Sequence, residues 1–467
     1  MVFSSLVFLL RFLPITILLY MIAPNIRIKN IVLIVASLLF YAWGEPVWVI
    51  LLIYSSLIDF VCGGLAGKYR NTAKGKLFMI ISLVLNLSLL GLFKYGNFFI
   101  DNFNALFGVS IPNSGISLPI GISFYTMQTI SYTIDAYRGK VKVQKSFLNF
   151  LLFVSMFPQL VAGPIVRYED IEDQLADRRI SLQDIYDGIM RFVLGLSKKT
   201  LIANYAGSLA VTFLDGDLMS LSAPYVWFGL LCFTFQIYFD FSGYSDMAIG
   251  LGRMFGFHFP ENFNHPYTAQ SITDFWRRWH MTLGTFFRDY VYIPLGGNRR
   301  LQYRNILIVW MLTGLWHGAS WNFVFWGLYF AVILILEKRF LLKALEKVPK
   351  AIRIAYSFFL VMFGFNFFYF VDFRRNMEAL QVMFGFAGAG FTGLDVWRLL
   401  INYLPFIALC VICAVPTKDY VLNKIRQRNL PEGVLAVGAA ICMTLALALS
   451  MSGIVSNSYN PFIYFRF

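Results

Sequence analysis

Charged residues are scarce in this sequence of 467 residues. Asp, Glu, Lys and Arg account for 14% of it, whereas soluble proteins contain about 25%, and hydrophobic residues account for 58%. This composition excludes a soluble protein and is typical of an integral membrane protein. No stretch is polar for long enough to form a soluble domain or a disordered linker. We therefore expect one all-α, polytopic membrane domain that covers residues 1–467.

Cysteine and histidine are also rare, with five and four residues respectively. The cysteines lie in or beside apolar runs, and the spacing of Cys410 and Cys413 is typical of packing residues on a span, so we assign no disulfide. His258 and His265 lack the spacing of metal ligands, and we expect no metal site. We also find no phosphate-binding glycine loop and no nucleophile elbow.

Basic residues outnumber acidic residues by 39 to 25, and their positions indicate how the chain crosses the membrane. Ten Lys and Arg residues follow the apolar runs 3–23, 46–66 and 118–136, whereas segments 44–46 and 101–117 contain none. Because loops rich in Lys and Arg stay in the cytoplasm, we expect the N-terminus on the extracytoplasmic side. The excess of basic residues thus lies beside the membrane lipids and sets the orientation of the chain, and we expect no nucleic-acid partner.

Further apolar runs are long enough to cross about 30 Å of hydrocarbon. Outside the regions discussed below, the expected spans are 3–23, 30–45, 46–66, 77–100, 118–136, 190–213, 224–250, 354–373, 399–416 and 434–453. The run 147–166 is interrupted by Pro158, Gly163 and Pro164, which predicts a re-entrant element surrounded by protein. These crossings give a multi-pass protein of the cytoplasmic membrane with both termini on the extracytoplasmic side.

The run 304–336 is too long for one span and too short for two. It predicts a hairpin of two shortened helices with a bend near residues 314–320, which places His317 deep in the membrane. An ionisable residue at that depth is either a satisfied packing residue or a functional group, and burial would keep its imidazole neutral, as a general base requires. Gly314 and Gly318 permit the close approach of a backbone or a substrate.

Polar side chains elsewhere in the core are candidates to line an internal passage. The span 224–250 contains Asp240 and Asp246 and is too polar to face lipid. These two carboxylates either act as acid and base groups or form ion pairs with Arg253 or with the basic residues of 277–304. The other residues expected near His317 are Trp316 and Trp321, as cavity walls, and Asn322, as a polar core residue.

The segment 272–290 predicts one amphipathic helix at the membrane interface, with its apolar residues within an arc of about 120°. His280 lies at the edge of this arc, and it is either a boundary residue with one solvated nitrogen or a donor or second base. The arginines of this region form a solvated face or bind the phosphates of a nucleotide-like donor. They are Arg277, Arg278, Arg299, Arg300 and Arg304.

Tyr464 lies close to the end of the tail that follows the last span. One interpretation is an aromatic anchor at the membrane interface. The other is a nucleophile that accepts or relays an acyl group.

Five segments carry long motifs in one order along the chain. They are FPQLVAGPIVRY (157–168), QIYFDFSGYSDMAIGLGRMFGFHFPENFNHPY (236–267), FWRRWHMTLGTFFRDYVYIPLGG (275–297), GLWHGASWNFVFWG (314–327) and NPFIYFRF (460–467). Together they resemble the membrane-bound O-acyltransferase (MBOAT) family. Within it, the chain is similar to the bacterial branch that serves alginate and peptidoglycan O-acetylation and teichoic-acid D-alanyl transfer. The similarity extends over nearly the whole chain.

The resemblance implies a ring-like bundle of about 10–12 transmembrane and re-entrant helices around a central tunnel. His317 matches the catalytic histidine of the family, and His280 matches the second histidine of the bacterial branch. The terminal FIYFRF is similar to the end of a companion peptide in which a tyrosine is proposed to take the acyl group, which implies a relay through Tyr464. The implied organisation is N-terminal spans in 1–145, a catalytic core in 146–350, and C-terminal spans and tail in 351–467.

The implied reaction is O-acetylation of an extracytoplasmic glycan, such as an alginate-like exopolysaccharide or peptidoglycan. Acetyl-CoA from the cytoplasm is the expected acyl donor, with no permanently bound cofactor. Because we find no fused hydrolase-like domain, an extracytoplasmic SGNH-type partner is expected to complete the transfer. The alternatives are D-alanyl transfer to teichoic acid and, in another class, a polysaccharide or lipid transporter or a non-catalytic docking subunit.

Overall fold

A computed structural model describes residues 1–113, 115–161, 163–417, 420, 421, 424, 432–456, 462 and 463. All regular secondary structure in these residues is helical, which confirms the predicted class. The described chain divides into two compact units, with residues 1–195 and 244–261 in unit 1 and residues 196–243 and 262–463 in unit 2. The expected ring around a tunnel and the single domain stay predictions.

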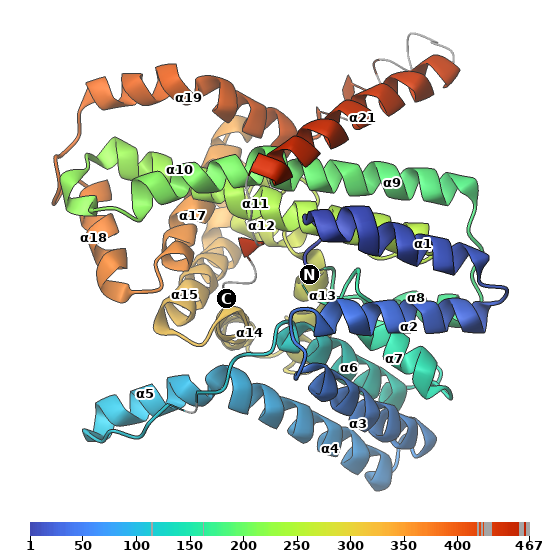
Figure 1. Cartoon of the computed structure of the whole chain (residues 1–467). Coiled ribbons are helices and arrows are strands. Elements are labelled where there is room, and N and C mark those ends of the chain that lie inside the picture. Colours follow the sequence, from blue (N-terminus) through green and yellow to red (C-terminus); the bar gives the residue numbers. More distant parts are fainter. Residues whose placement is uncertain are drawn as a thin grey trace. The chain divides into compact units, whose positions relative to one another are not determined.

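Unit 1 is an array of apolar helices in which α3 packs against α4, α6 and α7, and α2 packs against α1 and α7 (Figure 1). Its elements are η1 (Phe8–Phe12), α1 (Leu13–Ile22), α2 (Ile26–Ala42), α3 (Val49–Lys68), α4 (Ala73–Leu90), η2 (Gly91–Tyr95), α5 (Gly96–Phe107), α6 (Ile122–Arg138), α7 (Phe147–Ser155), α8 (Tyr168–Ala176) and most of α9 (Leu182–Ser197). Buried Asp59 of α3 accepts hydrogen bonds from Asn86 of α4 at 2.8 Å and Thr133 of α6 at 3.1 Å. Polar contacts therefore join three helices in this unit.

The predicted interruption of the run 147–166 is confirmed. Helix α7 ends at Ser155, before Pro158, and the described residues from 156 to 167 contain no helix before α8 begins at Tyr168. Proline cannot donate a backbone hydrogen bond and disfavours a helical residue before it. The described part of this non-helical segment is buried, as irregular backbone in a membrane protein needs to be.

Unit 2 contains the helices that carry the candidate site. Its elements are η3 (Lys198–Ala203), α10 (Asn204–Leu214), η4 (Leu218–Ser220), the first part of α11 (Ala223–Met254), η5 (Pro266–Thr268), α12 (Ile272–Arg278), α13 (Met281–Phe287), η6 (Arg288–Tyr292), α14 (Gln302–His317), α15 (Trp321–Leu336), η7 (Glu337–Leu341), α16 (Leu342–Leu345), α17 (Lys350–Tyr369), α18 (Phe373–Met383), α19 (Gly393–Ala414) and α21 (Glu432–Ser456). The largest contributions to its core of aromatic and aliphatic residues come from α11, α15 and α10.

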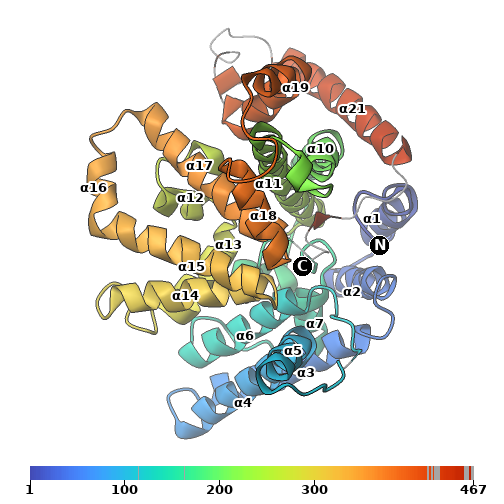
Figure 2. The same ribbon diagram turned by 90° about the vertical axis from the view of Figure 1, so that its left-hand side faces the viewer.

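The predicted hairpin is confirmed by α14 and α15, which run side by side (Figure 2). Glycines allow their backbones to approach closely. A Cβ atom on Gly314 would lie 2.3 Å from the carbonyl oxygen of Phe323, and one on Gly327 would lie 2.4 Å from that of Trp310. The bend between the helices follows His317 directly, so the hairpin fixes the position of this residue.

Within the described part of the chain, five helical segments are long and apolar enough to cross a membrane. They are Val49–Lys68, Ala73–Phe107, Lys350–Tyr369, Gly393–Ala414 and Gly433–Ser456, and Phe8–Ile22 is a shorter apolar helix. The segments agree in position with spans expected from hydropathy. The protein is therefore a multi-pass membrane protein.

Candidate active site

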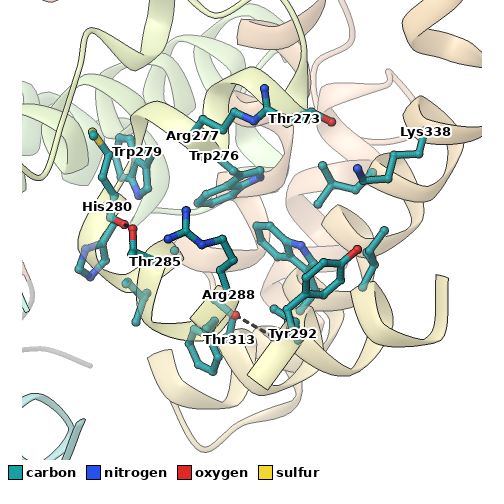
Figure 3. A pocket seen from close by; sticks show the side chains of 18 of the residues that line it. Thr273, Trp276, Arg277, Trp279, His280, Thr285, Arg288, Tyr292, Thr313 and Lys338 are labelled. Carbon is teal, nitrogen blue, oxygen red and sulfur yellow. Dashed lines mark hydrogen bonds between the residues drawn. The ribbon is translucent and has the colours of Figure 1, made fainter. Parts of the chain in front are cut away.

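A cavity of about 580 Å³ lies within unit 2, between α12, α13, η6, α14 and the junction of α15 with η7 (Figure 3). Aromatic rings form much of its wall, including those of Trp276, Trp279, Trp310 and Tyr292. Its described lining residues include cations and no carboxylate. An apolar cavity with a few cationic groups is suited to an elongated molecule with an anionic end.

The basic residues of the cavity are exposed, and they mark its entrance. They are Arg277, Arg288 and Lys338, and in Figure 3 the guanidinium group of Arg288 extends toward the side of the cavity where Trp276 lies. Arg288 forms an ion pair with Asp289 at 2.7 Å, whereas Arg277 and Lys338 form none within the described part of the chain. Burial and the charge of Arg277 both lower the pKa of Lys338. An anion between these two cations would relieve their repulsion.

Two buried histidines also line the cavity. The exposed fractions of His280 and His317 are 2% and 9%. The ring of Trp316 is close to both, with its centroid 5.8 Å from that of His280 and 5.0 Å from that of His317. The structure thus brings together the two histidines singled out in the sequence, although 37 positions separate them.

His280 is held in a defined tautomer by Asn262. The Oδ1 atom of Asn262 lies 3.4 Å from the backbone N–H of Thr282, which can only donate, so this atom is the amide oxygen and not the nitrogen. The Nδ1 atom of His280, 3.0 Å from the same oxygen, must therefore carry a proton and donate it. The lone pair is then on Nε2, which has no hydrogen-bond partner among the described residues. Burial lowers the pKa of His280 to about 3, so the imidazole is neutral at pH 7.

The prediction of one continuous helix over 272–290 is wrong, because the chain breaks at His280. Helix α12 ends at Arg278, and His280 adopts a left-handed conformation with φ 44° before α13 begins at Met281. The segment that contains Asn262 stabilises this break, since the carbonyl of Asn262 accepts a hydrogen bond from the N–H of Met281 at 3.0 Å. The helical periodicity could not show this long-range contact, and His280 is buried instead of lying at a boundary.

His317 is the last residue of α14, and aromatic rings fix its side chain. The rings of Trp326 and Phe368 are edge-on to its imidazole, at centroid distances of 5.0 and 5.1 Å. Asn322 supports this arrangement, because its Nδ2 atom donates to the carbonyl of Phe367 at 3.0 Å and so links α15 to α17. Neither Trp316 nor Trp321, the two expected cavity walls, lines this cavity: Trp316 is buried beside the two histidines, and 53% of Trp321 is exposed.

The two aspartates of α11 form ion pairs, but not with the expected partners. Asp240 pairs with Lys199 at 2.5 Å, and Asp246 pairs with Arg191 at 2.6 Å. Arg253 instead contacts Asp184 and Asp187. Neither Asp240 nor Asp246 lines the cavity. Of the two interpretations, the structure favours ion pairing over acid–base chemistry.

The predicted arginine cluster is dispersed. Arg277 lines the cavity, whereas the other four members do not: Arg278 pairs with Asp274 at 2.9 Å, and Arg304 donates to the carbonyl of Leu295 and to Asn305. Arg299 and Arg300 are exposed on the segment before α14. Basic residues close in sequence thus point in different directions once the helix breaks.

Sequence reasoning missed several residues of the site. Besides Asn262 and Lys338, Glu337 is fully buried and accepts hydrogen bonds from the backbone N–H groups of Ile272 and Thr273, each at 2.7 Å. It ties η7, and with it Lys338, to the start of α12. One signal was present, since Glu337 is an acidic residue at the beginning of a basic segment.

Tyr464 lies outside the described residues. The two residues before it are described, and both are buried: the exposed fractions of Phe462 and Ile463 are 1% and 6%.

Comparison with known proteins identifies the class. The model of the membrane-bound O-acyltransferase family matches residues 140–371, a range that contains the cavity and both histidines. The chain therefore belongs to this family, and it is a membrane acyltransferase.

Individual relatives extend this similarity over the whole chain. The protein is 38% identical to the probable alginate O-acetylase AlgI of Azotobacter vinelandii, with 100% of each chain covered. It is 32% identical to the peptidoglycan O-acetyltransferase of Helicobacter pylori, over 100% of this chain and 98% of the relative. The teichoic acid D-alanyltransferase of Bacillus subtilis is 30% identical over 55% of this chain and 70% of the relative.

Proposed function

We propose that the protein transfers an acetyl group from cytoplasmic acetyl-CoA to a polysaccharide outside the cytoplasm, with His317 as the general base. The observation that carries this proposal is the cavity, in which an exposed cationic entrance leads to two buried histidines. The relatives with full-length similarity O-acetylate alginate or peptidoglycan by name, which supports an acetyl group and an acceptor of this kind.

The proposed chemistry needs few groups. An acceptor hydroxyl oxygen attacks the thioester carbonyl carbon, His317 removes the hydroxyl proton, and the carbon–sulfur bond breaks as the ester bond forms. The proton then passes to the leaving thiolate, which gives free CoA. Because a thioester is already activated, no ATP is required, and positioning of the reactants and general-base catalysis suffice. The neutral Nε2 atom of His280 is a second acceptor for a proton or a hydroxyl group.

The entrance of the cavity suits the donor. Arg277 and Lys338 would bind phosphate groups of CoA, and the aromatic wall formed by Trp276 and Trp310 would contact its apolar parts. The charge asymmetry of the loops supports donor entry from the cytoplasm and termini on the opposite side of the cytoplasmic membrane. Labelling of single introduced cysteines from either side of the membrane checks this orientation.

The acceptor hydroxyl belongs to the glycan, to a partner or to Tyr464. In the last case, the acetyl group forms an ester with the Tyr464 phenol, and an extracytoplasmic SGNH-type partner transfers it to a glycan hydroxyl and regenerates the phenol. Tyr464→Phe removes this hydroxyl and keeps the ring. If transfer to glycan is undiminished in this variant, Tyr464 is only an interfacial anchor.

D-alanyl transfer is the second candidate. The teichoic acid D-alanyltransferase relatives support it, since they share this family, but they match about half of the chain. The O-acetylating relatives match all of it, so acetyl transfer has the stronger support. Competition between acetyl-CoA and a D-alanyl thioester for purified protein separates the two.

The decisive experiment compares two histidine substitutions in purified protein supplied with acetyl-CoA. His317→Ala is expected to reduce acetyl transfer by about 10²–10⁴-fold, the usual contribution of a general base. His258→Ala is the matched control, because the His258 side chain is 59% exposed and does not line the cavity. Retention of acetyl transfer by His317→Ala at unchanged protein abundance would refute the assignment, and absence of transfer by the wild type would favour a transporter or docking subunit.

A further inference from the structure

Lys199 and Asp240 form an ion pair in the interior of unit 2. The exposed fractions of their side chains are 3% and 2%, and the Nζ and Oδ1 atoms are 2.5 Å apart. Lys199 belongs to the π-helix η3, and Asp240 lies in the middle of α11. Residues of the described part of α11 near Asp240 are almost all apolar or small, so both charges are withdrawn from water.

The chain's own C-terminal segment contacts both members of this pair. The backbone N–H of Ile463 donates a hydrogen bond to Oδ2 of Asp240 at 2.7 Å. The ammonium group of Lys199 lies over the ring of Phe462, 4.7 Å from its centroid. The two carboxylate oxygens of Asp240 therefore have different partners, one on a helix and one on the tail.

A buried ion pair is weak evidence for a stabilising role. Its desolvation cost offsets most of the attraction, and apolar residues of similar volume often stabilise a core equally well. An apolar pair could not accept a hydrogen bond from a backbone N–H or place a cation over an aromatic ring. In this structure Asp240 accepts from the N–H of Ile463, and Lys199 lies over the ring of Phe462.

The tail contact is close to the candidate active site along α11. The ring of Phe241, the residue after Asp240, is edge-on to the imidazole of His280, with 4.7 Å between centroids. The ring of Tyr238 lies 6.1 Å from that of Trp279, which lines the cavity. One short stretch of α11 thus contacts the cavity wall and the tail.

We propose that the Lys199–Asp240 pair is a docking site for the C-terminal segment, recognising the Phe462 ring and the Ile463 backbone. Docking fixes the point from which the chain continues to Tyr464, so Lys199 and Asp240 are positioning residues for the end of the chain. The docking itself does not depend on the reaction. Only its role in positioning Tyr464 rests on the proposed function.

The test measures the release of C-terminal residues from the full-length protein by a carboxypeptidase, followed by mass spectrometry. Lys199→Met combined with Asp240→Leu replaces the pair by apolar residues of similar volume, and should release the end of the chain about tenfold faster or more. Ile463→Pro removes the donating N–H and should act in the same direction. Ile463→Val keeps the N–H and should match the wild type.

A second ion pair provides the matched control for the double substitution. Arg191→Met combined with Asp246→Leu removes a pair from the same helix α11, whereas the hydrogen bond of Ile463 and the cation–π contact of Phe462 are made with Asp240 and Lys199. Its rate of release should equal that of the wild type, with an unchanged thermal midpoint in all variants. Equal release from the wild type and the Lys199/Asp240 double variant would overturn the docking site. Faster release with undiminished acetyl transfer would retain the docking site and remove the relay through Tyr464.

Discussion

Substitution of Gly314 by alanine should impair both the stability and the activity of the protein. The added Cβ would lie 2.3 Å from the carbonyl oxygen of Phe323, whereas an ordinary carbon–oxygen contact needs about 3.4 Å or more, so α14 and α15 must separate by about 1 Å. Overpacking of this kind costs about 1–3 kcal/mol. His317 follows three residues later on the same helix face, and a displacement of about 1 Å at a reacting group can reduce the rate about 10²-fold.

Gly91→Ala is the control for this prediction. Gly91 has helical backbone angles, and no atom lies within 4 Å of the position its Cβ would take. Because alanine favours helix more than glycine, this variant should be as stable as the wild type, or more stable by up to about 1 kcal/mol. Thermal inactivation in detergent and the kcat for acetyl transfer provide the two measurements. If Gly314→Ala equals Gly91→Ala in both, the close packing of the hairpin does not position His317.

Two further predictions concern the histidine environment and the cavity entrance. Asn262→Asp places a carboxylate beside Nδ1 of His280, which should raise the pKa of this histidine by about 1–3 from its value of about 3. Since the ring must be neutral, the loss of activity on acidification should begin at a higher pH in this variant than in the wild type. Superimposable pH profiles of kcat/KM would contradict this prediction. Lys338→Gln or Arg277→Gln should raise the KM for acetyl-CoA about tenfold with little change in kcat. Arg299→Gln, outside the cavity, should leave the KM unchanged. An equal effect of all three substitutions would favour the phosphate-binding arginine cluster expected from the sequence.

Much of the fold could be predicted because hydropathy and charge report directly on membrane crossing. The hairpin illustrates this, since the length of the run 304–336 required two short helices, and the bend predicted near residues 314–320 is found between His317 and Trp321. The interruption at Pro158 could also be predicted, because the proline ring fixes the φ angle and removes a backbone donor wherever proline occurs. These signals are local, and the sequence contains them completely.

The site itself depended on contacts that are distant in sequence. His280 was expected at the surface of one helix, and only its contacts with the segment that begins at Asn262 explain why the helix breaks and the ring is buried. Ion pairing was one of the two interpretations of Asp240 and Asp246, but the choice of Lys199 and Arg191 as partners follows from how the helices pack. Residue type therefore indicated the chemistry, and packing determined the partners.

The backbone segments that carry the two histidines differ in how tightly they are packed. His317 ends a helix whose backbone touches that of its neighbour, whereas His280 is the hinge-like junction between two seven-residue helices. Rotation about this junction would change the gap between the rings without disturbing the hairpin. A movement of α12 and α13 would therefore shift His280, while the close packing of α14 against α15 would keep His317 in place.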